Sequence, residues 1–262
     1  MAKNIIFITK KNFFFSKLSL LLEKEGYFLT PLSRTNELPE KSFKKLENSI
    51  INCKKCPRLV NFRTKVAKDK RKQYINEKYW GKPITGFGDR KARILLVGLA
   101  PAAHGGNRTG RVFTGDKSSE FLYKCLHKAK LSNKSNSVHR NDGLILNDSF
   151  ITTALKCVPP GDKPTRNELN NCFKYFKNEI ENLENLKIII ALGKIAFDAC
   201  IEFYKKQFKI ENNIKFGHSK FFKLPNNILL VGSYHPSPRN VNTGRIDVNK
   251  MTNLFLKVKK VI

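Results

Sequence analysis

The sequence predicts an α/β fold in which a parallel sheet is covered by helices on both faces. From residue 92 onward, short apolar runs alternate with longer segments of helical periodicity. Runs that are apolar at nearly every position are typical of strands buried on both faces. Strands separated by helices favour parallel pairing, because a parallel connection needs a crossover. The carboxyl ends of such strands share one edge, so the loops after them should face one another.

Each element follows from its own pattern. Segments rich in Ile, Leu, Val and Phe predict strands at residues 93–98, 150–156, 187–192 and 227–233. Segments with apolar residues three and four positions apart predict helices at residues 118–130, 166–182, 194–207 and 247–261. Thr165 followed by Glu168 is a capping-box pattern, which marks a helix start at residue 166.

The N-terminal part of the chain follows a different pattern from the rest. Residues 1–42 resemble an appended extension, to which we assign no role, and residues 43–262 form the main domain. Residues 43–63 predict a helix that runs into a Cys-x2-Cys pair, and residues 64–91, charged and glycine-containing, predict a loop-rich lead-in.

The charge of the chain points to an anionic polymer as its partner. Among 262 residues, 50 Lys and Arg stand against 21 Asp and Glu, which gives a net charge of +29. Nucleic acid is the first candidate for so basic a protein, although a general bias toward Lys, Asn, Ile and Phe would also raise the charge. No apolar run approaches the ~20 residues of a membrane-spanning helix. We expect a cytoplasmic protein, monomeric and without a membrane partner.

A glycine-rich stretch follows the first predicted strand, where an α/β sheet places its ligand site. Glycine lets the backbone approach a ligand closely, and the glycines here are Gly98, Gly105, Gly106 and Gly110. Among them, Arg108 and Arg111 could hold an anion, Phe113 offers a flat apolar face and Asp116 offers a carboxylate. The Gly-Lys-Ser/Thr of a P-loop is absent, which disfavours a nucleotide hydrolase.

A second informative stretch, residues 233–245, follows the last predicted strand and should therefore face the glycine-rich loop. His235 could donate a hydrogen bond to negative charge that develops in a reaction. Pro236 and Pro238 stiffen the segment, which suits a wedge that enters a DNA stack. A structural turn with a capping histidine is the alternative interpretation.

Six cysteines are present, and a cytoplasmic location disfavours disulfides. Cys125 and Cys200 lie in helix-like apolar patterns, so we expect them in the core. The other four are Cys53, Cys56, Cys157 and Cys172. Four thiolates can hold either zinc or a [4Fe–4S] cluster, and the spacing alone leaves both open.

Three sequence blocks of this chain, together with the four cysteines, resemble the family-five (B-type) uracil-DNA glycosylases. The first two are Gly98-Leu-Ala-Pro-Ala-Ala-His-Gly and Arg108-Thr-Gly-Arg-x-Phe-Thr-Gly-Asp, and the third is His235-Pro-Ser-Pro-Arg-Asn-Val-Asn-Thr-Gly. The resemblance covers roughly residues 45–260. It implies a three-layer α/β/α sandwich on a central four-stranded parallel sheet. It also implies a [4Fe–4S] cluster, without a redox role in base excision, on the four cysteines named above.

The resemblance implies removal of uracil, flipped out of damaged DNA, by cleavage of its glycosidic bond. Such a reaction needs a group that stabilises the cationic sugar or its water, and a donor to the departing base. We expect Asp116 in the first role and His235 in the second, although Asp116 could instead cap the following helix. The substrate-binding candidates are Gly98, Ala100, Pro101, Ala102, Phe113 and Thr153. The DNA-binding candidates are Arg108, Arg111, Ser237, Arg239, Asn240 and Arg245.

One departure from related enzymes concerns the range of bases. Thr153 stands where those enzymes often place an Asn that pairs with the edge of uracil. A threonine cannot make a bidentate amide pair, so hypoxanthine and xanthine become plausible substrates. Alanines also occupy the positions after the first strand where related enzymes carry a polar residue. A non-catalytic nucleic-acid-binding protein, stapled by a metal, is therefore the alternative function.

Overall fold

A six-stranded sheet forms the centre of the computed structural model, which describes residues 39–208, 210 and 214–262. The part from Ser42 to Ile262 is one compact unit. Most of the predicted extension, residues 1–38, lies outside the described residues.

The four predicted strands are the middle of this sheet, and all of them pair in parallel. In spatial order they are β3 (Ser149–Thr153), β2 (Ile94–Gly98), β4 (Ile188–Leu192) and β6 (Leu229–Ser233). A short antiparallel strand flanks each side, β1 (Phe87–Gly88) beside β3 and β5 (Phe221–Lys223) beside β6. The prediction of a four-stranded sheet is therefore correct for the parallel centre and misses both edges.

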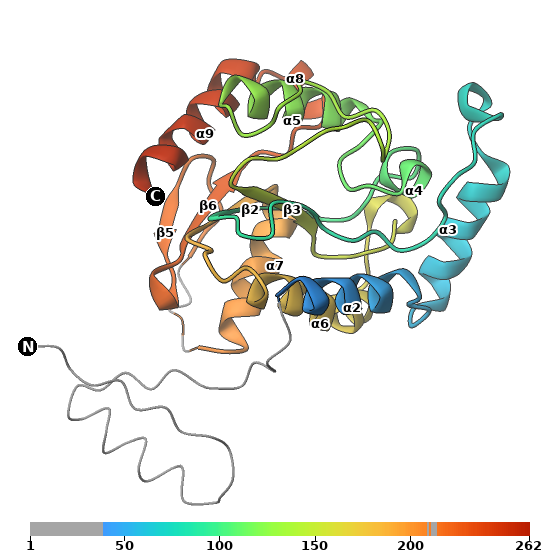
Figure 1. Cartoon of the computed structure of the whole chain (residues 1–262), viewed down its shortest axis with the longest axis horizontal. Coiled ribbons are helices and arrows are strands. Elements are labelled where there is room, and N and C mark those ends of the chain that lie inside the picture. The colour runs from blue at the N-terminus through green and yellow to red at the C-terminus, as the bar shows by residue number, and fades with distance from the viewer. Residues whose placement is uncertain (1–38, 209, 211–213) are drawn as a thin grey trace, which may run out of the picture. The chain divides into compact units, whose positions relative to one another are not determined.

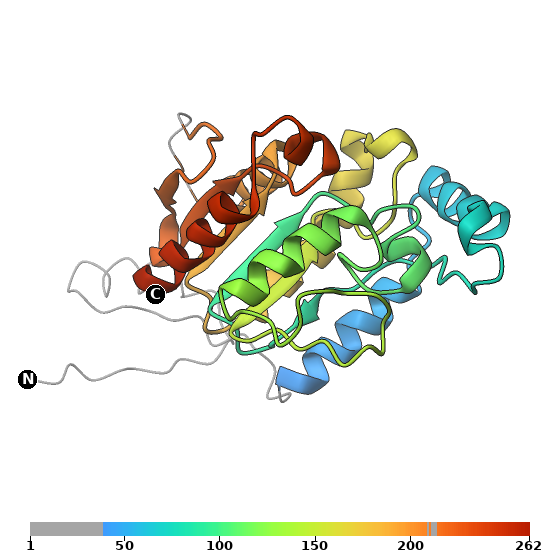
Figure 2. The same ribbon diagram turned by 90° about the horizontal axis from the view of Figure 1, so that it is seen from above.

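Helices cover both faces of the sheet, as the pattern predicts (Figures 1 and 2). On one face lie α5 (Lys117–Lys128) and α9 (Val248–Val261), and on the other lie α6 (Arg166–Glu181) and α7 (Lys194–Lys205) with part of α2 (Pro39–Ile51). The side chains of β2 alternate between the two cores. Ile94 and Leu96 pack toward α5 and α9, whereas Leu95 and Val97 pack toward α6 and α7. None of the described helices is long and apolar enough to cross a membrane.

Polar caps fix where several helices begin. The predicted capping box at α6 is confirmed, because Thr165 Oγ1 accepts from the Glu168 N–H at 3.2 Å and Glu168 Oε2 accepts from the Thr165 N–H at 2.8 Å. Asp247 caps α9 by accepting from the Lys250 N–H at 2.8 Å. These caps satisfy amide groups that the helix itself leaves unpaired.

The helix predicted at residues 43–63 is wrong as a single element. The chain forms α2 and then α3 (Pro57–Asp69), with the two cysteines of the pair in and beside the break. Proline lacks an amide hydrogen and is tolerated in the first turn of a helix, so Pro57 favours a new start after Cys56. Two short helices, α4 (Gly106–Thr109) and α8 (Pro238–Asn242), were also missed, because helices of four and five residues are too short to show a periodic pattern.

Candidate active site

A cleft of about 630 Å³ opens at the carboxyl edge of the parallel strands. Its walls come from residues 99–102 after β2, residues 192–196 from the end of β4 to the first turn of α7, and His235 with residues 237–239 after β6. The remaining lining residues are Phe113, Asp116, Ser118 and Asp162. The prediction that the loops after the strands share one face is therefore confirmed, and the glycine-rich stretch faces the stretch around His235.

Asp116 is the helix cap that the sequence offered as an alternative, and it also lies in the wall of the cleft, where its catalytic role stays a prediction. It caps α5, because its Oδ1 accepts from the Ser119 N–H at 2.8 Å, and it also lines the cleft. Burial raises the pKa of Asp116, while the Ser119 amide opposes that shift. A side chain at Gly105 would collide with Asp116 Oδ2, so the glycine makes room for the carboxylate. The cap holds the carboxylate still at the cleft wall.

His235 presents a neutral imidazole to the cleft. Burial lowers the pKa of His235 to about 4, so the ring carries no charge near neutral pH. A neutral imidazole has one N–H to donate and one nitrogen to accept. The Asn240 side chain donates to the His235 carbonyl at 2.9 Å and thereby ties the loop after β6 to α8. The arrangement suits donation of a hydrogen bond to a group that gains negative charge.

Phe113 lies beside His235, with ring centroids 6.0 Å apart and planes tilted by 34°. Its backbone has a φ of 45°, which is uncommon for a residue with a bulky side chain. A Cβ at Gly98 would stand 2.7 Å from the Phe113 ring, so the glycine at the end of β2 allows this packing. Strained backbone of this kind persists where the surrounding structure holds it, often at functional sites.

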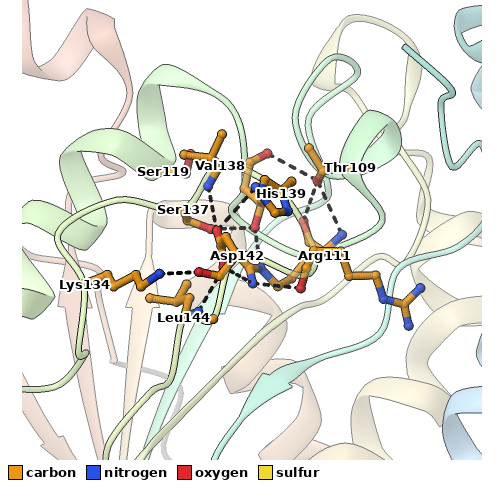
Figure 3. A network of polar contacts seen from close by, with 12 residues as sticks. Thr109, Arg111, Ser119, Lys134, Ser137, Val138, His139, Asp142 and Leu144 are labelled. Carbon is orange, nitrogen blue, oxygen red and sulfur yellow. Dashed lines mark hydrogen bonds and ion pairs between the residues drawn. The ribbon is translucent and has the colours of Figure 1, made fainter.

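The assignment of Arg111 to DNA binding is wrong. Its side chain is only 4% exposed and pairs with both carboxylate oxygens of Asp142, at 2.9 and 2.6 Å (Figure 3). It also donates to Ser137 Oγ at 2.7 Å and to Thr114 Oγ1 at 3.0 Å. The Arg111–Asp142 pair therefore fixes residues 137–144 against the segment that carries Phe113. These contacts leave the Arg111 guanidinium without a free N–H group to donate to a phosphate of DNA.

Arg108 is likewise a structural residue. Its guanidinium donates to Glu77 at 2.6 Å and to the carbonyls of His104 and Gly115, both at 2.7 Å. It also stacks on Tyr74, with 3.8 Å between the guanidinium carbon and the ring centroid. Since the residue is buried, these contacts hold the glycine-rich loop in shape, and a contact of Arg108 with DNA stays a prediction.

The other DNA-binding candidates lie around the third block. Arg239 is exposed and lines the cleft, and Ser237 lines it while capping α8 by accepting from the Asn240 N–H at 3.4 Å. Asn240 supports the His235 loop, as described above. Arg245 is exposed but is not among the residues that line the cleft. Their contacts with DNA stay predictions.

The substrate-binding candidates divide into two groups. Ala100, Pro101, Ala102 and Phe113 line the cleft. Gly98 and Thr153 face each other across the β2–β3 pair and are not among the lining residues. Thr153 is buried, and its carbonyl accepts from Lys156 Nζ at 2.8 Å.

The wall formed by the end of β4 and the first turn of α7 lies on the edge predicted from the sequence, but none of its residues was among the predicted site residues. Lys194 and Ile195 line the cleft there, directly after Gly193, whose φ is 102°. Gly193, at the end of a predicted strand, was the available signal. The residues after the end of a parallel strand lie at the same edge of the sheet as the other loops.

A separate small cavity gathers the four cysteines from distant parts of the chain. Cys53 and Cys56 come from the break between α2 and α3, Cys157 follows β3, and Cys172 lies on α6. The Lys156 N–H donates to Cys172 Sγ at 3.2 Å. Among the described residues, no group of three or more His, Cys, Asp or Glu forms a ready site for a metal ion. Cys125 and Cys200 are core residues, as predicted.

Two features of this cavity bear on whether it could hold an anionic, sulfur-ligated group, of which burial disfavours free thiolates and Arg63 favours negative charge. Burial raises the pKa of Cys157 to about 11 and that of Cys172 to about 12, so without a metal both thiols stay protonated near neutral pH. Arg63 is buried beside them, donates to the Cys53 carbonyl at 3.5 Å, and has an Nε without a hydrogen-bond partner in the described part of the chain. A buried cation is stabilised by an anionic neighbour, which metal-bound thiolates would supply.

Comparison with known proteins agrees with this geometry. Residues 85–259 match the uracil DNA glycosylase superfamily. The type-5 uracil-DNA glycosylase of Pyrobaculum aerophilum is 41% identical over 208 residues, which are 79% of this chain and 88% of that protein. The type-5 uracil-DNA glycosylase of Thermus thermophilus is 41% identical over 213 residues, 81% of this chain and 95% of that protein. That of Mycobacterium tuberculosis is 39% identical over 216 residues, 82% of this chain and 80% of that protein.

Proposed function

The chain belongs to the uracil-DNA glycosylase superfamily and is a DNA glycosylase that removes uracil, and we propose that it breaks the glycosidic bond in the cleft at the carboxyl edge of the sheet. The observation that supports this location is the meeting of Asp116, His235 and Phe113, from two separate loops, around one cavity. The alternative of a non-catalytic nucleic-acid-binding protein does not account for the family membership.

In this proposal each side chain acts on a different part of the reaction. The flipped uracil stacks on Phe113 and points a carbonyl oxygen toward His235. As the bond from C1′ to the base nitrogen breaks, negative charge moves into uracil, and the N–H of neutral His235 stabilises it. The Asp116 carboxylate stabilises the cationic sugar and orients the water whose oxygen bonds to C1′. The proton released by that water balances the one that uracil takes up.

We further propose that the cleft accepts other deaminated bases. The polar side chains in its lining are those of Asp116, Ser118, Asp162, Lys194, His235, Ser237 and Arg239. No Asn or Gln is among the described lining residues, so a bidentate amide pair with the edge of uracil is not available there. Sites that do not pair with a substrate in this way discriminate weakly between related bases.

The base range is tested by single-turnover release of free base from matched duplexes that contain uracil, hypoxanthine, xanthine or thymine. We expect release of the three deaminated bases within about two orders of magnitude of one another, and no release of thymine opposite adenine. Release confined to uracil would contradict the broad range and leave the uracil activity intact.

We propose that Cys53, Cys56, Cys157 and Cys172 hold a [4Fe–4S] cluster, which supplies a structural tie between α3, the loop after β3 and α6. Four thiols around one cavity, an amide hydrogen bond to sulfur and the incompletely paired Arg63 support this assignment. The purified protein should be brown and contain iron and acid-labile sulfide in equal amounts.

Replacing Cys53 by alanine should remove iron and lower the unfolding temperature, because binding of the group is coupled to folding. Cys125→Ala is the matched control, since Cys125 is buried in the core on the α5 face and should keep the iron. A colourless protein with one zinc ion would overturn the cluster but keep the four ligands. Full iron content in Cys53→Ala would overturn the ligand set.

A further inference from the structure

The segment before β5 docks closely on the end of β6, immediately before the loop that carries His235. The Ser219 N–H donates to the Gly232 carbonyl at 2.8 Å. A Cβ at Gly232 would stand 2.5 Å from the Gly217 carbonyl oxygen, so the two backbones approach as closely as glycine allows. This contact brings His218 against Tyr234, the residue that precedes His235.

His218 makes two kinds of contact with Tyr234. The two rings stack, with centroids 5.2 Å apart and planes only 6° from parallel. The backbone N–H of Tyr234 donates to His218 Nδ1 at 3.2 Å. Phe216 packs on Tyr234 with an edge-on geometry, at 6.0 Å and 61°. The Tyr234 main chain is therefore bonded to a side chain from another segment.

The hydrogen bond dictates the protonation state of His218. An imidazole nitrogen that accepts a backbone N–H carries no proton, so the neutral ring must carry its hydrogen on Nε2. The environment agrees, because burial and the nearby charge of Lys250 lower the pKa of His218. His218 Nδ1 is therefore available near neutral pH to accept the hydrogen bond from the Tyr234 amide.

We propose that His218 is a positioning residue that holds His235 in place through the main chain of Tyr234. His218 is not among the residues that line the cleft, so it acts on His235 and not on the base. The bond to Tyr234 fixes the backbone before His235, and the Asn240 side chain fixes the His235 carbonyl itself. This inference rests on the function proposed above for His235.

Two substitutions separate the hydrogen bond from the ring contact. His218→Phe keeps an aromatic ring against Tyr234 and removes the acceptor. His218→Asn removes the ring and keeps an acceptor, because Asn Oδ1 lies the same number of bonds from Cβ as Nδ1 of histidine. We expect His218→Phe to lower the single-turnover rate of uracil release at saturating enzyme by roughly 10-fold to 100-fold, since small misplacements of a catalytic group are costly. DNA affinity should not change, and His218→Asn should recover most of the rate.

The matched control is His127→Phe, because His127 is an exposed histidine near the C-terminal end of α5, whereas Asp116 lies at its N-terminal end. It should excise uracil at the wild-type rate. A wild-type rate in His218→Phe, or equal losses in the Phe and Asn variants, would overturn the positioning role.

Hydrogen exchange at the Tyr234 amide tests the same inference without any activity measurement. The amide should be protected in the wild type and in His218→Asn, and should exchange faster in His218→Phe. Equal protection in all three proteins would overturn the proposal. A wild-type protein that releases no uracil would instead contradict the proposed function, whatever the exchange data show.

Discussion

Replacing His235 by alanine is expected to slow uracil release from DNA by roughly 10²–10³-fold, the usual cost of losing one transition-state hydrogen-bond donor. The donor acts on charge that exists only as the bond breaks, so the affinity for uracil-containing duplex should barely change. The measurement is single-turnover release of free uracil, together with duplex affinity and unfolding temperature. His127→Ala is the control, since it removes an exposed imidazole from α5.

The loss in His235→Ala should also be independent of pH near neutrality. Burial lowers the pKa of His235 to about 4, so the ring is neutral at about pH 6 and about pH 8 alike. A loss that disappears as pH rises through the ordinary histidine range would mean that the charged imidazole acts in catalysis. A rate within a few-fold of the wild type would show that His235 does not stabilise the leaving base.

Replacing Asp116 by asparagine is expected to slow excision by about 10²-fold, while the protein stays as stable as the wild type. Asparagine and aspartate are both good helix caps, so the contact with the Ser119 amide can persist. The variant loses the negative charge that would stabilise the sugar cation and orient water, and such groups contribute at least this much to rate. Single-turnover release and thermal unfolding, measured side by side, separate the two roles.

The pH dependence gives an independent check on Asp116. Burial raises the pKa of this carboxyl, and the proposed role needs the ionised form. Excision by the wild type should therefore fall as pH decreases through that raised pKa, sooner than an ordinary aspartate would cause. Asp116→Asn should lack this decline. If Asp116→Asn excises at the wild-type rate, Asp116 is a helix cap only, and the backbone and His235 carry the chemistry.

The parallel core could be predicted from the sequence because its strands are buried on both faces and read as apolar runs. Edge strands β1 and β5 could not, since they are short, partly exposed and carry no such run. The Thr165–Glu168 box was predicted from its spacing alone, because both partners lie within one turn. The prediction of one helix at residues 43–63 was wrong, because helical periodicity is present on both sides of Cys53 and the new helix that starts at Pro57 was not recognised.

The sequence predicted the site residues that lie in connections after strand ends. It did not predict contacts between side chains that are far apart along the chain. Phe113 and Asp116 lie in the connection after β2, and His235 lies in the connection after β6. These connections leave the same edge of the sheet, so the three side chains meet at one cleft. Arg111 resembles a phosphate ligand in the sequence, but its partner Asp142 is 31 residues away, and only the fold shows the pair. From the sequence alone, an arginine that is buried in an ion pair cannot be distinguished from an exposed arginine that binds DNA.

We propose that uracil is cut from DNA in the cleft between Asp116 and His235. This location is tested most directly by quantifying free uracil and abasic sites from a single-uracil duplex with the wild type and with the Asp116→Asn, His235→Ala double variant. The wild type should leave one abasic site for each uracil that it releases. The double variant should bind the duplex with unchanged affinity and release uracil at least about 10³-fold more slowly than the wild type. Near-wild-type release by the double variant would show that the bond is broken elsewhere, and an intact duplex after binding by the wild type would show that uracil is not removed.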